Sequence, residues 1–273
     1  MHTVLAAAEE GGKDSAEVFN DVLSHLAPHQ YGWAPTWEVA GIDLSITNAV
    51  VNIFLAAALV IIVFSIAASR SALVPKGIRN LVEAAMDWAK DQLVYSVMKP
   101  EDGRTWAPLI LTLFFFIFFM NLVGLIPWIG FTPTSVIWLT VIMAFMVYLI
   151  AITVGMVKHG PLKFWKLTLV PPDVPAWLKP FMVVLIEPIS QLARPFSLAV
   201  RLFANMLADH LLILTFAGFI FIASGFVLAF VLPVALAGIV IFTAFAIFVA
   251  FIQAVVFAYL SAIYINDGLH PGH

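Results

Sequence analysis

Residues 226–265, FVLAFVLPVALAGIVIFTAFAIFVAFIQAVVFAYLSAIYI, contain no Asp, Glu, Lys or Arg. A helix needs about 20 apolar residues to cross a hydrocarbon core of ~30 Å. As one helix, this stretch would be about 60 Å long at 1.5 Å per residue. It therefore folds either into two spans that break near Pro233 or Gly238, or into one helix tilted by about 60°. Both arrangements place the chain in a membrane.

The composition of the whole chain agrees with this placement. Of 273 residues, 63% are hydrophobic and 11% are charged, whereas soluble domains are about 45–50% apolar and about 25% charged. A soluble enzyme and a disordered chain are both excluded. The chain has no cysteine, which excludes disulfide scaffolds and thiolate sites. Because no phosphate-binding loop, metal-ligand spacing or Ser–His–Asp arrangement is present, we expect no metal, no cofactor and no nucleic-acid partner.

Three further apolar regions are long enough to cross a membrane. The first clear span is about 47–68, and residues 107–157 carry no charge but are interrupted by Pro127, Gly130 and Pro133. The interruptions predict spans at about 106–126 and 135–157. Residues 181–223 are also mostly apolar and raise the same length problem as the last stretch.

The remaining segments are polar or amphipathic. Within residues 70–104, apolar residues at helical spacing predict an amphipathic surface helix; they are Leu81, Ala84, Ala85, Trp88 and Leu93. Residues 1–44 are acidic, and their apolar residues at helical spacing suggest either a short interfacial helix or a loosely ordered arm; these residues are Val18, Phe19, Val22, Leu23 and Leu26. We expect an N-terminal arm over 1–44 and a single transmembrane domain over 45–273.

The basic residues orient the chain. Ten of the thirteen lie in two loops: Arg70, Lys76, Arg79, Lys90, Lys99 and Arg104 in the first, and Lys158, Lys163, Lys166 and Lys179 in the second. By the positive-inside rule both loops face the cytoplasm, or the equivalent matrix side. The acidic N-terminus and the turn at 127–134 then lie outside.

Charged residues inside a span are costly and are functional candidates by default. Glu187, Arg194 and Arg201 are spaced by seven residues, so each lies about 20° from the last and they form one stripe of a helix. Asn205 is near the same face, whereas His210 lies on the opposite side.

Each polar residue in the spans also has a structural interpretation. Arg194 lies near a span end and is able to extend its guanidinium to the interface. His210 is able to pack in the core and donate to a backbone carbonyl. Gln253 is the only strongly polar side chain in the sequence 226–265, and its amide suits hydrogen bonding between helices. Against these interpretations, imidazole titrates near neutrality, and an adjacent Asp209–His210 pair in a membrane favours a proton relay.

The motif RPFSLAVRLFANMLADH at residues 194–210 resembles the signature of the a subunit of F-type ATP synthases. The segments FMNLVGLIP, KHGPLKFWKLTLVP, IEPIS and FIQAVVFAYLSAIY resemble it too, so the resemblance runs from about 45 to 266. It implies an all-α membrane protein with five transmembrane helices and an amphipathic surface helix. The last two helices would form a long, steeply tilted hairpin against a ring of c subunits.

The resemblance also implies a function and roles for single residues. The chain would be the proton-translocating stator subunit of a bacterial inner membrane, N-terminus outside and C-terminus inside. Its partners would be the c-ring, b-type stalk subunits and the soluble ATPase head, which carries out the ATP chemistry. Arg201 is similar to the essential arginine that separates two aqueous half-channels, Glu187 to an exit-side acid, and His210 to an entry-side residue. Asn205 and Gln253 match polar positions of the two long helices.

Two departures from the family pattern stand out. Asp209 replaces the glycine that usually precedes the His210 position, and Ala246 stands where the last helix commonly carries Glu or His. We hypothesise that the entry-side acid has moved from the last helix to Asp209. The rival functions are a secondary transporter, which predicts inverted repeats that the sequence lacks, and a structural scaffold, which leaves the charges of 187–210 unexplained.

Overall fold

The computed structural model describes most of the chain, in seven segments: residues 38–39, 42–43, 47–68, 77–126, 131–169, 186–223 and 225–271. The chain divides into two compact units. The first contains the described residues up to Val60 together with Phe116–Val136 and Phe203–Ile252, and the second contains Ile61–Phe115, Ile137–Leu202 and the residues from Gln253 onward.

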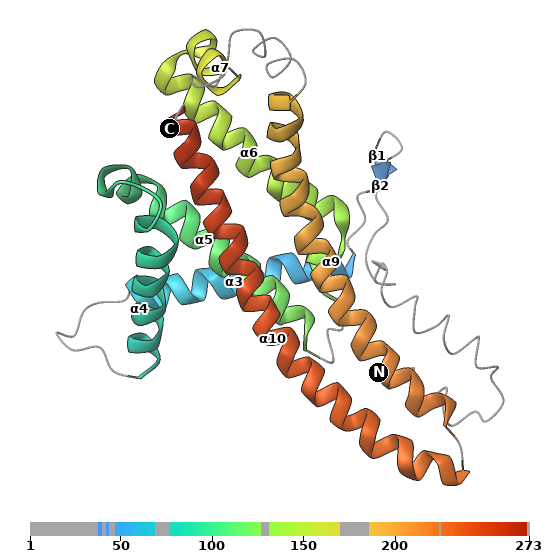
Figure 1. Ribbon diagram of the computed structural model, residues 1–273. Helices are drawn as coiled ribbons and strands as arrows, with labels where there is room; N and C mark the ends of the chain where they lie inside the picture. The colour runs from blue at the N-terminus through green and yellow to red at the C-terminus, as the bar shows by residue number, and fades with distance from the viewer. Residues whose placement is uncertain are drawn as a thin grey trace. The chain divides into compact units, whose positions relative to one another are not determined.

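Within the described residues, five helices are long and apolar enough to cross a membrane, as predicted. They are α3 (Asn48–Ala68), α5 (Pro100–Gly124), α6 (Ile137–His159), α9 (Glu187–Ile222) and α10 (Gly225–Leu269), all labelled in Figure 1. The protein is therefore an all-α, multi-pass membrane protein. A separate arm and a single domain over 45–273 remain predictions.

The helix ends follow local sequence signals more than apolar content alone. The predicted first span, 47–68, is α3 to within one residue. By contrast, α5 begins six residues before the predicted 106. Its first residue is Pro100, whose fixed φ suits the first helical position. Glu101 and Asp102 follow in the first turn and favour the positive end of the helix dipole.

The last stretch is one helix. α10 runs for 45 residues through Pro233 and Gly238 without a break, so the two-span alternative is wrong. At 1.5 Å per residue it is about 68 Å long, more than twice the hydrocarbon core. α9 runs for 36 residues through Pro195. These lengths support the predicted steep tilt, which itself remains a prediction.

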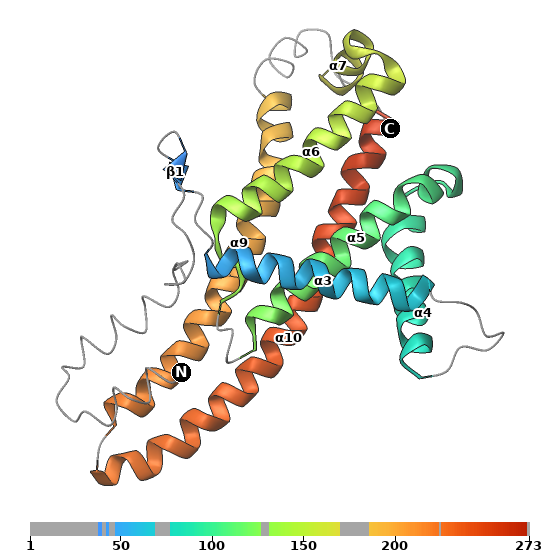
Figure 2. The same cartoon turned by 180° about the vertical axis from the view of Figure 1, so that it is seen from behind.

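α9 and α10 form an antiparallel hairpin. In the first unit the rings of Phe216 and Phe242 stack with centroids 5.2 Å apart. A Cβ at Gly238 would lie 2.6 Å from the Phe216 ring, so this glycine permits the close approach. Both views draw these parts of the two helices side by side (Figure 1 and Figure 2).

The predicted amphipathic helix is α4 (Ile78–Ala89), which continues into the π-helical turn η1 (Lys90–Tyr95). Leu93 is buried, but Leu81 and Trp88 are 70% and 41% exposed. An apolar face left open in this way is typical of a helix that lies in the membrane interface.

One segment differs from its prediction. Residues 161–169 were expected to be loop but form the helix α7 (Pro161–Leu169). Gly160 has φ +81°, a left-handed conformation that ends α6, and Pro161 then occupies the first position of the new helix. Phe164 of α7 is buried against Gly155, which has no side chain to block it.

The N-terminal region is described at four residues. β1 (Glu38–Val39) and β2 (Ile42–Asp43) pair antiparallel, with Val39 opposite Ile42. The interfacial helix considered for 1–44 lies outside the described residues, as do three of the orienting basic residues, Arg70, Lys76 and Lys179.

Candidate functional site

The candidate site is carried by α9, whose two sides differ in character. Leu198, Ala199, Leu202 and Met206 are at most 1% exposed and form the buried side of the helix. They recur at the i, i+4, i+8 spacing of one helical face. Arg201 lies outside this face and is exposed.

Small exposed residues flank Arg201 along the helix. Ser197, Ala204 and Ala208 are all exposed, and they fall four residues before and three and seven after Arg201, on one face. Among the described residues, no hydrogen bond or ion pair involves the Arg201 guanidinium. Small side chains allow another helix to approach closely in a membrane, so this face suits a partner that brings a negative charge to Arg201.

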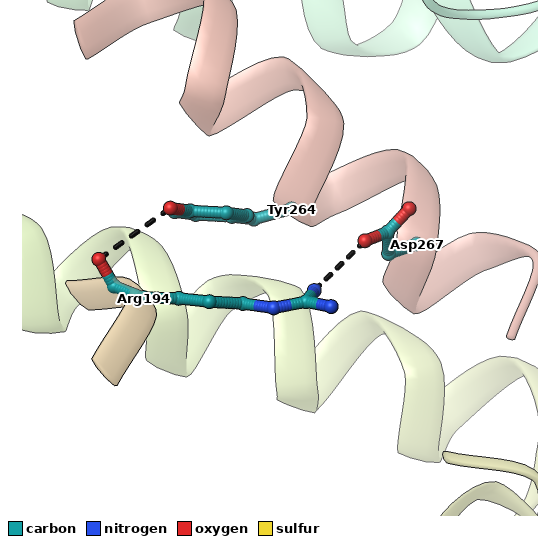
Figure 3. A network of polar contacts seen from close by, with 3 residues as sticks. All are labelled: Arg194, Tyr264 and Asp267. Atoms are coloured by element: carbon teal, nitrogen blue, oxygen red, sulfur yellow. Dashed lines mark hydrogen bonds and ion pairs between the residues drawn. The ribbon is translucent and has the colours of Figure 1, made fainter. Parts of the chain in front are cut away.

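Arg194, two turns earlier, has its counter-ion within the chain. Its Nη1 donates to Oδ2 of Asp267 in α10 at 2.8 Å. Tyr264 lies alongside the Arg194 side chain: its ring centroid is 5.9 Å from the guanidinium carbon, and its hydroxyl donates to the Arg194 carbonyl at 3.4 Å (Figure 3). Arg194 therefore links two helices, and its position at the membrane interface remains a prediction.

A small cavity lies beside this link. Its volume is about 40 Å³, and its polar lining comes from Tyr148, Thr168, Gln191, Arg194, Tyr264 and Asp267. A space of this size holds about one water molecule. The other two predicted site residues of the second unit are Glu187, the first residue of α9, and Gln253, which is 1% exposed in α10.

The first unit holds the other predicted residues, Asn205, Asp209 and His210. Asp209 is 8% exposed, and its Oδ2 has no hydrogen-bond partner among the described residues. His210 has a partner far away in sequence: its Nε2 lies 2.6 Å from Oγ1 of Thr132. Ala246, where the family commonly has an acid, is 1% exposed in the same unit.

Thr132 belongs to a buried polar turn between α5 and α6, residues 131–135, which includes the 3₁₀ turn η2 (Pro133–Ser135). Asn52 Nδ2 donates to the carbonyl of Phe131 at 2.7 Å. Thr134 Oγ1 donates to Oδ1 of Asn121 at 2.6 Å. These bonds satisfy polar groups that would otherwise be costly to bury, so they fix the turn in place.

Sequence reasoning missed two residues that the structure brings to the site, Thr132 and Asp267. Thr132 carries no local signal, because its contact with His210 spans 78 positions. Asp267 did carry one. It is the first charged residue after the uncharged stretch 226–265, and it lies on α10, which runs antiparallel to the helix α9 that carries Arg194.

The chain matches known proteins along most of its length. Residues 50–266 match the family model described as ATP synthase A chain. A protein named ATP synthase subunit a from Beijerinckia indica is 39% identical over 235 residues, covering 85% of this chain and 90% of that protein. The namesake from Methylobacterium sp. is 39% identical over 250 residues (90% and 97%), and that from Maricaulis maris is 40% identical over 248 residues (87% and 93%). The chain belongs to the ATP synthase A chain family.

Proposed function

We propose that this chain is the stationary subunit that supplies the c-ring of an F-type ATP synthase with two aqueous half-channels for protons. As a family member it is a proton-translocating subunit of the membrane sector. It is a component of the complex and does not make or hydrolyse ATP alone.

The observation that carries the proposal is the state of Arg201. A guanidinium stays protonated in proteins, and a charge within a span is costly unless it is matched. Arg194 is matched by Asp267 at 2.8 Å, whereas Arg201 is exposed and unmatched among the described residues. Its natural counter-charge is a carboxylate of the ring. Arg201 then keeps that carboxylate ionised as it passes and repels a proton that would leak directly between the half-channels.

The remaining predicted residues divide between the two half-channels. We assign Asp209 and His210 to the entry side, because a buried carboxylate beside an imidazole supports stepwise proton transfer. We assign Glu187 to the exit side. Asn205 on α9 and Gln253 on α10 have polar side chains, which would bind water molecules in the proton path near Arg201.

Location and partners follow from the same proposal. The chain spans the inner membrane of a bacterium, with its N-terminus on the outer side and its C-terminus on the cytoplasmic side. The basic residues of the loops at 70–104 and 158–179 support this orientation. The c-ring contacts α9 and α10, b-type subunits of the peripheral stalk hold the chain stationary, and the soluble head connects through the complex. Purification of the tagged chain in mild detergent is expected to recover all three.

Cysteine cross-linking tests the face of α9 that contacts the ring. The chain has no native cysteine, so single cysteines give a clean background. We expect Ala204→Cys, on the exposed face, to form a disulfide with a cysteine placed one turn from the ring carboxylate. Ala199→Cys is the matched control, since Ala199 is 1% exposed on the buried face. Equal cross-linking by both variants, or cross-linking by Ala199→Cys alone, would contradict the proposal.

A further inference from the structure

The hydrogen bond between Thr132 and His210 joins the turn between α5 and α6 to the middle of α9. The Oγ1–Nε2 distance is 2.6 Å, and the Thr132 side chain is fully buried, at 0% exposure. The two residues belong to the same compact unit. The contact is therefore a short bond from a fully buried residue to the half-buried imidazole that the proposed function assigns to the entry path.

The turn holds the Thr132 hydroxyl in a fixed position. The carbonyl of Thr132 accepts from the backbone N–H of Ser135 at 3.0 Å and from its hydroxyl at 2.7 Å. A Cβ at Gly124 would collide with the Thr132 side chain, so the glycine creates the space that Thr132 fills. The β-branched side chain of Thr132 is also stiff at χ1.

A hydroxyl suits a histidine that changes its protonation state. When Nε2 of His210 carries no proton, the Thr132 hydroxyl donates to it; when Nε2 is protonated, Nε2 donates and the hydroxyl oxygen accepts. In the imidazolium, and in the neutral tautomer that keeps the Nε2 proton, Nε2 donates to the hydroxyl and Nδ1 exchanges a proton. In the other neutral tautomer the hydroxyl donates to Nε2, so the ring is held in place in each state. A carbonyl, which only accepts, would lose the bond whenever Nε2 carries no proton, and an ammonium group, which only donates, would lose it whenever Nε2 is protonated.

The helical segments of this unit contain few side chains that could exchange a proton with His210. Segments 47–60, 116–136 and 203–252, which make up the helical part of this unit, contain no Asp, Glu, His, Lys, Arg or Tyr apart from Asp209 and His210. Within these three segments, Asp209 is thus the titratable neighbour of His210, and Thr132 is an uncharged partner that holds the ring without adding a charge.

We propose that Thr132 is a positioning residue of the proton path, whose hydroxyl orients the imidazole of His210 through both of its protonation states. This inference rests on the proposed function, because it gives His210 a part in proton entry. It adds a residue on a different element, the turn at 131–135, to a path otherwise assigned to α9 and α10.

The test compares three variants in the assembled complex. Thr132→Val keeps the side-chain shape but removes the hydroxyl, and Thr132→Ser restores a hydroxyl. Thr134→Val is the matched control: Thr134 is equally buried in the same turn and also makes a 2.6 Å bond, but to Asn121. ATP-driven proton pumping into inverted vesicles is measured between about pH 6 and about pH 9, per amount of assembled chain.

We expect Thr132→Val to lower pumping by about tenfold or more, since a positioned acid–base group contributes at least that much, and to change the shape of the pH profile. Thr132→Ser is expected to stay within about twofold of the unmodified chain. Thr134→Val loses a bond that holds the turn but keeps the Thr132 hydroxyl, so we expect it to lower the rate less than Thr132→Val does and to leave the shape of the pH profile unchanged. If Thr132→Val does not assemble, Thr132→Ala replaces it, because it removes the same hydroxyl without filling the space.

Three results would overturn the inference: a normal rate and profile without the Thr132 hydroxyl, no rescue by Thr132→Ser, or the same profile change in Thr134→Val. Arg201→Ala is measured in parallel to separate the two proposals. Normal pumping by Arg201→Ala would overturn the proposed function itself. Loss of pumping in Arg201→Ala together with normal behaviour of Thr132→Val would overturn only the role of Thr132.

Discussion

Gly268 allows the end of α10 to pack against α6, and replacing it with alanine tests this packing. A Cβ at Gly268 would overlap the carbonyl oxygen of Ala151 and lie 3.1 Å from the Ala151 carbonyl carbon. The contact is reciprocal, because a Cβ at Gly155 would lie 2.8 Å from the carbonyl oxygen of Gly268. Backbone atoms of packed helices do not move aside as a flexible side chain does.

The magnitude follows from two opposing effects. Overpacking costs about 1–3 kcal/mol, while Gly→Ala inside a helix gains about 0.5–1 kcal/mol. We therefore expect Gly268→Ala to destabilise the chain by about 1–2 kcal/mol net. Because Gly268 follows Asp267, the link to Arg194 is displaced as well, so proton pumping should fall together with stability.

Gly218 provides the matched control. It lies in the last turns of α9, and an added Cβ there meets nothing within 4 Å, so Gly218→Ala is expected to be neutral or slightly stabilising. The assay is the temperature at which the chain leaves the detergent-solubilised complex, which should drop by about 2–8 °C for Gly268→Ala. Equal midpoints for the two variants would refute the close-packing argument.

Two further predictions concern charged residues. Asp209→Gly should reduce proton flux sharply, and Asp209→Gly combined with Ala246→Glu should restore it; normal coupled pumping in the single variant would reject the exchange of acids. A double-mutant cycle with Arg194→Gln and Asp267→Asn should give a coupling of about 0.2–1 kcal/mol in complex stability, because the two side chains are 37% and 46% exposed. Additive effects of the two changes would show that the ion pair contributes nothing.

The spans could be predicted because lipid imposes a simple requirement on the sequence. An uncharged apolar run of sufficient length marks each crossing, and α3 begins one residue from its predicted start. Helix ends beyond the lipid were harder to predict. α5 and α7 begin at Pro100 and Pro161, where proline and dipole effects decide, and these signals are weaker than hydropathy.

The candidate site could be predicted only in part. Arg201, Asp209 and His210 stand out because charge is rare in a span. Their partners do not, since a contact such as Thr132–His210 depends on how distant elements pack. Helical spacing places Arg194 and Arg201 on one stripe, and the family resemblance singles out Arg201. The structure adds a physical difference between them, because Asp267 pairs with Arg194, whereas Arg201 has no ion pair in the described part of the chain.

The most direct test of the account is ATP-driven proton pumping by complexes that carry Arg201→Ala. Arg104→Ala serves as the control, because Arg104 is also an exposed helical arginine, in the first turns of α5. With assembly of both variants verified, we predict that Arg201→Ala abolishes pumping and that Arg104→Ala leaves it close to normal. Pumping that survives in Arg201→Ala would contradict the claim that this arginine separates the two half-channels.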